Sequence, residues 1–590
     1  MKFIKKSNFN LYNLLFGLLF ILLLYFTMQR HSKTGYFNYR SEIWADKAGY
    51  YVYLPALLIY NFDANKFPKD MDDRTGNGFN LDESNNKIRT KYTCGVALLQ
   101  LPFFAAAHLY AKVSRYEADA YSPPYHKAMN VGAVFYLVLG LYLLFKILSK
   151  YFSAALSFFT TITLLAGTNL LYYGIDETLM SHVFSFSVFC ILIYLNDRLA
   201  SDNFKNIKLF AMISLFVAIS VLLRPTNIII VLVILFWDIY NIKRLKQKLV
   251  ALLNVRYLLI LAGAFIVILL PQALYWYYLS GKFIFYSYGN EGFSNWNAPK
   301  FAEVWFSPNN GLFLYSPFLL LVIIAIIFML FKRMKNSVLL ALLFIFISYL
   351  CGSWHNWYFG CSYGQRSFVD FYGFFVFPLA FLGRELGRAA LKFVKYIYVA
   401  VVLIFIYYNV MMIISYKECY FGDTWSWDEY IDTVEKSCFI SFAGKTFTYS
   451  NDFENTAIVH WSKVSKDYSH SYDFSGKINE NDSFFVCYQN EIQNIKIKKL
   501  NNYVVGLWVY YPDFINKGAK LVVAIDEGEK SIYWEGFELD KLINEPDRWF
   551  YVQKTVNFPA GINPADILKI YVWNERNMLL YVDDFYLKFE

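Results

Sequence analysis

The sequence predicts a polytopic α-helical membrane protein with about 11 spans, followed by a β-sandwich domain outside the cytoplasm. Three observations predict this architecture. Of the 590 residues, 57% are hydrophobic and only 17% are charged, which is unlike a soluble chain of this length. Long apolar runs recur as far as residue 415, and basic residues collect between alternate runs. Beyond residue 455, apolar and polar residues alternate as they do in β-strands.

The predicted spans follow from the length of the apolar runs. A helix needs about 20 apolar residues to cross a bilayer. Lys2, Lys5 and Lys6 precede the first run, so we expect a cytoplasmic N-terminus, and no small-residue cleavage site follows that run. The eleven predicted spans are 11–28, 128–148, 153–173, 179–195, 209–223, 226–240, 257–277, 312–331, 337–351, 368–382 and 396–415. This odd number places the C-terminal domain on the outer face.

Basic residues in the predicted inner loops agree with this topology. They are Lys146, Lys150, Arg198, Lys205, Lys208, Lys243, Arg244, Lys246, Lys248, Lys332, Arg333, Lys335, Arg384, Arg388 and Lys392. They also account for the net charge of +9 without a nucleic-acid partner. Two interpretations of the apolar run 96–113 stay open, a span or a helix in the outer interface. We favour the interface, because a span would break the alternation of every later basic loop.

The composition also predicts the domain boundaries. Residues 1–415 form the transmembrane domain, with 29–127 as a long first outer loop that contains interfacial helices, and 416–454 form a linker. Residues 455–590 form the β-sandwich. Its strand pattern and its end, IYVWN followed by YVDDFYLKF, resemble the jelly-roll, carbohydrate-binding modules of secreted glycan enzymes.

Individual residues of the C-terminal region leave alternatives open. Trp534, Trp549 and Trp573 are either platforms for sugar rings or buried core residues, and buried Trp is commoner in sandwiches. Cys419 and Cys438 could pair, although spacing does not decide it, and the seven Cys residues show no CxxC motif of a zinc or redox site.

Unusual polar residues gather in four segments on the predicted outer face: 44–55, 91–95, 167–182 and 354–366. Their order, spacing and common side resemble the GT-C superfamily of membrane glycosyltransferases, and most of all the bacterial relatives of protein O-mannosyltransferases and of the lipid A aminoarabinose transferase. The resemblance covers residues 10 to about 415. It implies a polyprenyl-phosphate sugar donor, a glycan, lipid or protein acceptor, inversion at the anomeric carbon, and a place in the bacterial cytoplasmic membrane.

On this resemblance, Asp46 matches the carboxylate of the first outer loop and would take the proton from the acceptor hydroxyl. We expect partial burial to raise its pKa and so to improve it as a base. Alternatively, Asp46 only caps the helix that follows. The family often has a second acidic residue beside this position, where this chain has Lys47. Asp176 and Glu177 match the second acidic loop and could bind the acceptor, orient a base or hold a divalent cation with Asp46, or they are ordinary solvated charges.

The leaving phosphate needs fixed cations, and Arg suits phosphate through its bidentate fork. Arg366 is the first candidate, followed by Lys91 and by Arg224. Arg224 lies between two short apolar halves of about 22 Å against a bilayer core of about 30 Å, so it should be recessed below the surface. The alternative for Arg366 and Arg224 is contact with lipid headgroups.

Further candidates could bind the donor phosphate or the sugar. They are His182, Tyr92, Trp354, Trp357 and Tyr363. A packing role for His182 and a place in the interfacial aromatic belt for the others are the alternatives. No Walker loop or Rossmann motif is present, so no nucleotide cofactor is expected, whereas a divalent cation stays possible.

Three other functions remain compatible with a polytopic chain. A transporter or flippase of lipid-linked glycans predicts inverted repeats and charges near the bilayer midplane. A non-catalytic scaffold that displays a glycan-binding domain predicts that Asp46 and Arg366 are dispensable. An O-antigen ligase or polymerase often has its large outer loop between late spans, whereas here it follows the first span.

Overall fold

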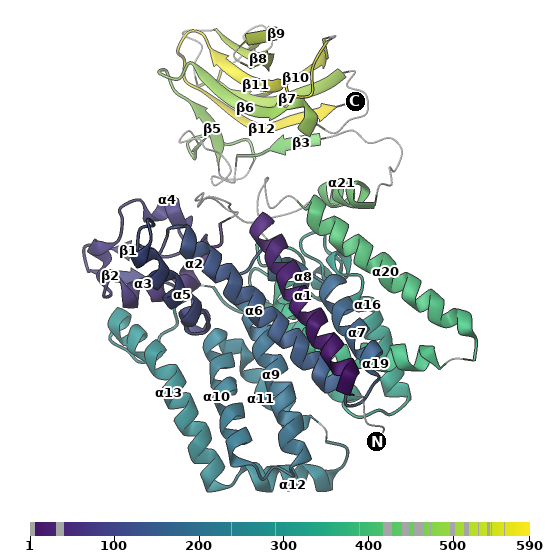
Figure 1. Cartoon of the computed structure of the whole chain (residues 1–590). Coiled ribbons are helices and arrows are strands. Elements are labelled where there is room, and N and C mark those ends of the chain that lie inside the picture. The colour runs from purple at the N-terminus through teal and green to yellow at the C-terminus, as the bar shows by residue number, and fades with distance from the viewer. Residues whose placement is uncertain are drawn as a thin grey trace. The chain divides into compact units, whose positions relative to one another are not determined.

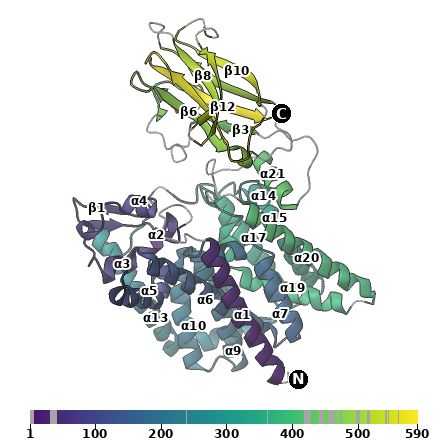
Figure 2. The same ribbon diagram turned by 45° about the horizontal axis from the view of Figure 1, so that its top comes forward.

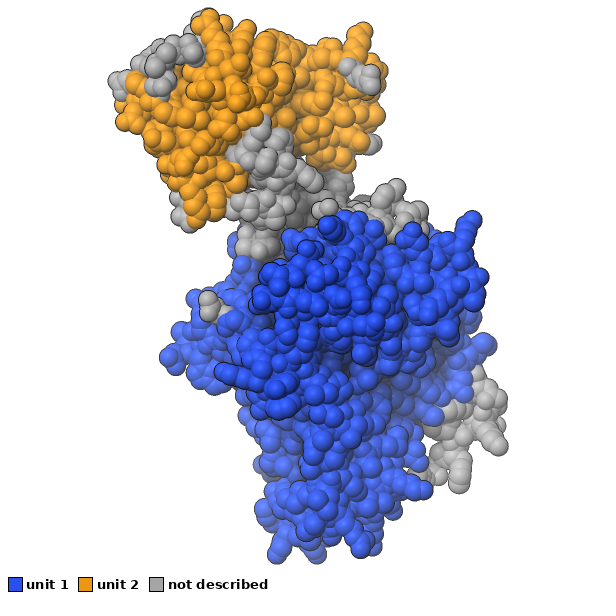
Figure 3. Space-filling model, turned by 90° about the vertical axis from the view of Figure 1, so that its left-hand side faces the viewer, with its two compact units in different colours: residues 1–416, 426–438 blue, residues 417–425, 439–590 orange. Residues whose placement is uncertain are grey.

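The computed structural model describes residues 6–30, 41–237, 239–289, 291–360, 362–388, 390–416, 427–438, 448–453, 464–471, 474–495, 502–512, 518–528, 530–539, 543, 546–559 and 561–589. Contacts divide the chain into two compact units (Figure 3). The helical unit comprises residues 1–416 and 426–438, and the β unit comprises 417–425 and 439–590.

Six helices of the helical unit are long and apolar enough to cross a membrane, which makes the chain a multi-pass membrane protein. They are α1 (Lys6–Arg30), α5 (Gly95–Val113), α6 (Pro123–Leu148), α9 (Ser181–Ser201), α13 (Val255–Ser280) and α20 (Lys392–Ser415) (Figure 1). Five shorter apolar helices accompany them: α7 (Ala154–Ala166), α10 (Ile207–Leu223), α11 (Ile230–Phe236) with η2 (Pro225–Ile229), α16 (Leu319–Phe331) and α17 (Ser337–Ser353).

The predicted helical membrane region is therefore confirmed, while the number of crossings stays a prediction. Five of the six long helices coincide with predicted spans, and the sixth, α5, is the run of uncertain placement. The remaining predicted spans coincide with the shorter helices and with α19 (Tyr372–Gly387). Small residues and Pro shorten several of them. The run 312–331, for example, is divided at Ser316-Pro317 into α15 (Leu312–Tyr315) and α16.

The helical unit has two distinct ends, which are named here after one element at each. At the α2 end, the chain between α1 and α5 folds into α2 (Asp46–Tyr51), α3 (Tyr53–Leu58), η1 (Ala64–Lys66), α4 (Met71–Thr75) and the hairpin of β1 (Asn80–Asp82) and β2 (Lys87–Arg89) (Figure 2). The α12 end carries the amphipathic helix α12 (Ile242–Leu252) (Figure 1).

Contacts between distant segments define these ends. At the α2 end, Arg30 of α1 bonds to Asp176 and, through Nη2, to the carbonyl of Ile413 in α20 at 3.2 Å. At the α12 end, Lys150 pairs with Asp197 of α9, and Arg244 of α12 donates to the carbonyl of Ala200 at 3.1 Å.

The remaining helices of this unit are short connectors near the helix ends. They are α8 (Leu170–Ile175), α14 (Phe301–Phe306), α18 (Arg366–Val369) and α21 (Trp427–Cys438). The helix α21 belongs to the helical unit, although it lies within the predicted linker 416–454. Cys419 lies outside the described residues, so its pairing with Cys438 stays a prediction.

The β unit is entirely antiparallel, which confirms the predicted β region. One sheet has six strands: β10 (Trp549–Asn557), β7 (Asn502–Tyr510), β12 (Leu580–Phe589), β5 (Ser475–Ile478), β4 (Val464–Ser465) and, paired with β12, β3 (Thr448–Asn451). The other has four: β6 (Phe484–Glu491), β11 (Ile567–Asn574), β8 (Ala519–Glu527) and β9 (Lys530–Glu538). The jelly-roll topology stays a prediction.

Both sheets contribute to one hydrophobic core. Alternate residues point inward, as the period of two requires, including Leu507 and Val509 of β7 and Leu521 and Val523 of β8, all fully buried. No Trp belongs to this core in the described part of the unit. Trp534, Trp549 and Trp573 lie on outer faces instead, so the expectation that they are core residues is wrong. The strand register places them on the alternate, outward positions.

Candidate active site

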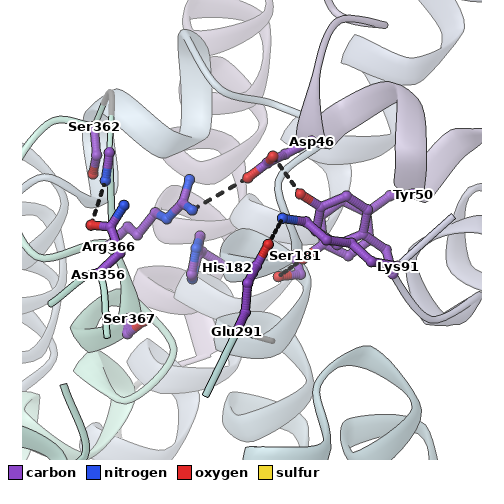
Figure 4. A network of polar contacts seen from close by, with 12 residues as sticks. Asp46, Tyr50, Lys91, Ser181, His182, Glu291, Asn356, Ser362, Arg366 and Ser367 are labelled. Atoms are coloured by element: carbon purple, nitrogen blue, oxygen red, sulfur yellow. Dashed lines mark hydrogen bonds and ion pairs between the residues drawn. The ribbon is translucent and has the colours of Figure 1, made fainter. Parts of the chain in front are cut away.

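Asp46 is the first residue of α2, and its carboxylate joins segments that are far apart in the sequence. Its Oδ1 accepts a hydrogen bond from the Tyr92 hydroxyl, and its Oδ2 lies 3.3 Å from Nη2 of Arg366 (Figure 4). The N-cap of α2 is Ala45, without a side-chain cap bond, so Asp46 does not have the capping role considered above. The carboxylate is instead held by a phenol and a guanidinium.

The neighbours of Asp46 decide its charge. Burial on its own raises the pKa of this carboxyl, but the Arg366 guanidinium, the Tyr92 hydrogen bond and the Lys91 ammonium together outweigh burial. The pKa of Asp46 therefore lies below its ordinary value, opposite to the increase expected from partial burial alone. Asp46 is ionised at neutral pH and remains a weak base while Arg366 is paired with it.

Two tyrosines and Lys91 line the same site. Burial, followed by the charge of Asp46, raises the pKa of Tyr92, which keeps the phenol protonated as a donor. Tyr50 packs its ring 4.3 Å from that of Tyr92, and its hydroxyl lies 3.1 Å from Oγ of Ser181. Lys91 forms an ion pair with Glu291 at 2.7 Å (Figure 4). Glu291, in the long loop before α14, is a site residue that the sequence reasoning missed.

A second polar cluster surrounds Arg224. Because Pro225 follows it, the Arg224 backbone is extended and ends α10. Its Nη1 lies 3.3 Å from Oδ2 of Asp370, and its Nη2 donates to Oγ of Ser367 at 3.2 Å. Nδ1 of His182 lies 2.8 Å from Oδ1 of Asp370 and 3.0 Å from Nη1 of Arg224. The carboxylate of Asp370 thus neutralises Arg224 and orients His182.

Sequence reasoning missed Asp370 and Ser367, although a signal for Asp370 exists. It is an acidic residue within the apolar run 368–382, and an ionisable residue in such a run is a candidate for function. The two clusters adjoin, because α18 contributes Arg366 to the first and the next residue to the second. Tyr50 links them as well. The pKa of Tyr50 is raised, mainly by burial. Arg224 of the second cluster and Arg366 of the first both lower it, and Asp46 raises it, so this hydroxyl lies within reach of the charges of both clusters.

Asp176 and Glu177 lie near this site in separate ion pairs. Arg30 holds Asp176 through a bond of 2.5 Å, and the buried Lys47 holds Glu177 at 3.2 Å. Neither is an ordinary solvated loop charge. No group of three His, Cys, Asp or Glu side chains suited to a metal ion occurs in the described part of the chain. The structure therefore does not bring Asp46, Asp176 and Glu177 together as a ligand set.

The predicted sugar-binding aromatics divide into two kinds. Tyr363 is fully buried, and its ring packs against those of Tyr172, Tyr315 and Tyr416, so no face is left for a sugar. Gly364, which follows Tyr363 at a bend of the chain, has a left-handed φ of 63°, a conformation that Gly adopts without strain.

Trp354 and Trp357 are half-buried. Trp354 packs edge-on against Phe293 and Tyr288, and Trp357 packs against Tyr358. Of the three, these two stay candidates for contact with a sugar.

Arg366 retains hydrogen-bonding capacity. Asp46 is the one hydrogen-bond acceptor of its guanidinium among the residues that the structure describes, and the side chain is 19% exposed. Arg has five N–H donors in a planar fork. Several donors are therefore available to an anion that enters the site.

Comparison of the sequence with models of known protein families and with curated proteins found no match in either case.

Proposed function

We propose that this protein is a GT-C-type membrane glycosyltransferase that transfers a sugar from a polyprenyl-phosphate donor to an acceptor hydroxyl on the outer face of the bacterial cytoplasmic membrane. One observation carries the proposal. A carboxylate and an arginine separated by 320 residues meet in one polar cluster, where they are joined by Tyr92 and lie near Lys91. Such a juxtaposition supplies both an acid–base group and a binding group for an anion.

The charge distribution supports an outer site. Lys150, Arg198, Lys205 and the basic residues of α12 belong to the loops at the α12 end. The excess of Lys and Arg marks cytoplasmic loops, so this end is assigned to the cytoplasm and the α2 end to the outside.

The assignment of the α2 end to the outside also indicates where α5 lies. This helix begins against Leu223 at the end of α10, and its His108 bonds to Tyr125 in the first turn of α6 at 2.6 Å. Both of these helix ends belong to the α2 end. We therefore place α5 at the outer interface and count eleven crossings without it.

In the proposed reaction, the acceptor oxygen attacks the anomeric carbon from the face opposite the phosphate. The C–O bond to the phosphate breaks as the new glycosidic bond forms, so the configuration inverts. Asp46 takes the proton that the acceptor hydroxyl loses. The departing polyprenyl phosphate carries away the electron pair of the broken bond, and Arg366, with Lys91 and Arg224, stabilises its charge.

Donor binding would also activate the base. In the free protein, Arg366 is paired with Asp46 and lowers its pKa. A phosphate that attracts the same guanidinium adds negative charge near Asp46 and weakens this pair. Both effects raise the pKa of the carboxyl and strengthen it as a base when the sugar is in place.

The test is a transfer assay on Asp46→Asn, which keeps the shape of the side chain and removes its basicity. Membranes with the wild type or the variant receive a panel of radiolabelled polyprenyl-phosphate sugars, and label transferred to membrane-associated glycan, lipid or protein is counted. We expect a loss of about 10²–10⁴-fold in the variant. Asp70→Asn, at an exposed carboxylate that pairs with Arg74 on α4 outside the cluster, is the matched control and should retain transfer. Normal transfer by Asp46→Asn would reject the base, and no transfer by the wild type from any donor would favour a transporter or a scaffold.

A further inference from the structure

The outer face of the four-stranded sheet carries an exposed row of aromatic rings, which we name the aromatic strip: Phe484, Tyr571, Trp573 and Trp534. Phe484 of β6 lies directly opposite Trp573 of β11, and Trp534 belongs to β9 at the other edge. Phe484 is 54% exposed and Trp534 is 48% exposed. Exposed aromatic side chains that lie together on one face are candidates for a binding surface.

The strip is held in a fixed shape. The indole Nε1 of Trp534 donates to the Tyr571 hydroxyl at 3.2 Å, and the indole lies over Gly536. A Cβ at position 536 would come within 2.6 Å of that ring, so only Gly leaves the ring its place. The rings of Phe484 and Trp573 are nearly parallel, at 19°, with centroids 6.3 Å apart. A ligand would therefore meet an ordered surface and would spend little free energy on ordering side chains.

On the six-stranded sheet, by contrast, two aromatic rings are covered by other rings. The ring of His470 stacks on Trp508 with centroids 3.7 Å apart, and Tyr468 stacks on Tyr510 at 4.5 Å. Both covering residues come from one segment, whose backbone N–H at His470 donates to Asp583 at 2.7 Å. The rings of Trp508 and Tyr510 are thus covered by flat rings of the same chain. Within the described residues, no segment from outside the four-stranded sheet stacks on Trp534 or Phe484.

Charge limits the kind of ligand that fits the strip. The two lysines at its rim are paired, Lys520 with Glu575 and Lys569 with Asp526, each at 2.7 Å. These two pairs leave no net positive charge beside Trp573 and Tyr571 to attract anionic lipid or nucleic acid. A neutral ligand is favoured.

The area of the aromatic strip limits the kind of ligand further. The strip extends over four strands and three residue rows, about 14 Å by 14 Å, or roughly 200 Å². A stable protein interface needs about 800 Å² on each partner. The strip is therefore the size of a few sugar rings rather than of a protein partner.

We propose that the aromatic strip binds a neutral glycan by stacking of sugar rings on its two exposed members, Trp534 and Phe484. The half-buried Trp573, with Nζ of Lys520 5.0 Å from its ring centroid, packs beside Phe484 and supports the strip. A sugar ring presents C–H groups on its faces and hydroxyls at its edge, which matches flat rings beside a hydroxyl donor. The Tyr571 hydroxyl accepts from Trp534, so its own O–H can be donated to the ligand. The further step, that this glycan is the acceptor of the transfer reaction, rests on the proposed function.

The experiment measures binding of the purified full chain in detergent micelles, without donor lipid, to an array of neutral oligosaccharides derived from bacterial envelope and plant glycans. The wild type should bind at least one of them. Trp534→Ala and Gly536→Ala should each weaken that binding about tenfold, the second by displacing the indole without removing a ring. Tyr551→Ala is the matched control, since Tyr551 is 46% exposed on the six-stranded sheet. It should leave the affinity unchanged.

Two results would overturn the proposal. One is a wild type that binds no oligosaccharide on the array, and the other is unchanged binding in Trp534→Ala and Gly536→Ala. The outcome is separable from that of the transfer reaction, because Asp46→Asn should bind the array glycan like the wild type. Loss of array binding in the strip variants, together with normal transfer by Asp46→Asn, would reject the proposed base while supporting the glycan site.

Discussion

The two units of this chain bury opposite kinds of side chain. The helical unit buries ionisable groups in its interior, including Asp370 and His182, each at most 2% exposed, and holds them in a polar network. The core of the β unit consists almost entirely of aliphatic and aromatic residues, and the Trp residues that the structure describes in this unit lie outside that core. Buried charges are costly unless they are paired, so they persist where chemistry needs them. On the proposed function, this difference assigns the transfer reaction to the helical unit and glycan recognition to the β unit.

Among the tests of this difference between the two units, removal of the Arg366 side chain should give the largest effect, a loss of transfer rate. Arg366→Gln removes the charge that pairs with Asp46 and the donors proposed for the phosphate. We expect the transfer rate to fall about 10²–10³-fold, which is about 3–4 kcal/mol. Arg366→Lys keeps the charge without the planar fork and should give an intermediate rate. Equal rates for the three proteins would remove Arg366 from the mechanism.

The same variant has a consequence for pH. Because the pKa of Asp46 is depressed, its basic form should persist below pH 4, and the wild type should show no acid limb from this residue at pH 5–8. Without Arg366 the pKa of Asp46 rises. As the pH is lowered, kcat/KM of the variant should therefore begin to fall at a higher pH than kcat/KM of the wild type. The measurement is the pH profile of residual transfer. An unshifted acid limb in Arg366→Gln would show that Arg366 does not control the charge of Asp46.

Asp583 is a buried carboxyl within the β unit and gives the next effect. It is fully buried, and burial, partly opposed by backbone N–H donors, raises the pKa of its carboxyl from 3.8 to about 6. The folded unit therefore holds a proton that the unfolded chain releases near pH 3.9. This contribution to stability is complete below about pH 3.9 and disappears as pH rises through 6, by about 3 kcal/mol.

Hydrogen exchange of β-unit peptides in the full chain, corrected for the intrinsic rate, checks this dependence. Protection should decrease between pH 4 and 6 in the wild type. Asp583→Asn cannot titrate and should lose that slope whatever its absolute stability, while the nearby pair of His470 and Asp584 remains. A slope that persists in Asp583→Asn belongs to another group.

Asp370→Asn should give the smallest of these effects. Asp370 contacts Arg224 and His182 and acts through them, so it is a positioning residue. Loss of one charged hydrogen-bond partner costs about 2 kcal/mol, or about thirtyfold in transfer rate. We expect this loss mainly in KM for the donor, with kcat nearly retained. A fall in kcat alone would contradict a role in phosphate positioning.

The features of the fold and of the site that could be predicted are those that local sequence patterns determine. Apolar runs and alternating strands are local patterns, so the helical and β regions were predictable from the sequence. Asp46, Arg366 and Lys91 were identified as outer-face charges, and the structure places them together.

What was missed depended on long-range contacts. Asp370 lies in an apolar run and Glu291 in a long loop, and only the fold shows that they pair with Arg224 and Lys91. The direction of the Asp46 pKa shift depends on contacts of this kind, and the burial of Tyr363 depends on the rings of Tyr172, Tyr315 and Tyr416 that pack around it.

The bond network of Arg30 has a consequence for biosynthesis. Arg30 ends α1, yet one of its partners is the carbonyl of Ile413 near the end of α20, almost four hundred residues later in synthesis. A nascent chain therefore inserts α1 long before this arginine can complete its contacts. The packing of α1 against α6 can form early, but the helical unit can close at this end only after translation has passed residue 413.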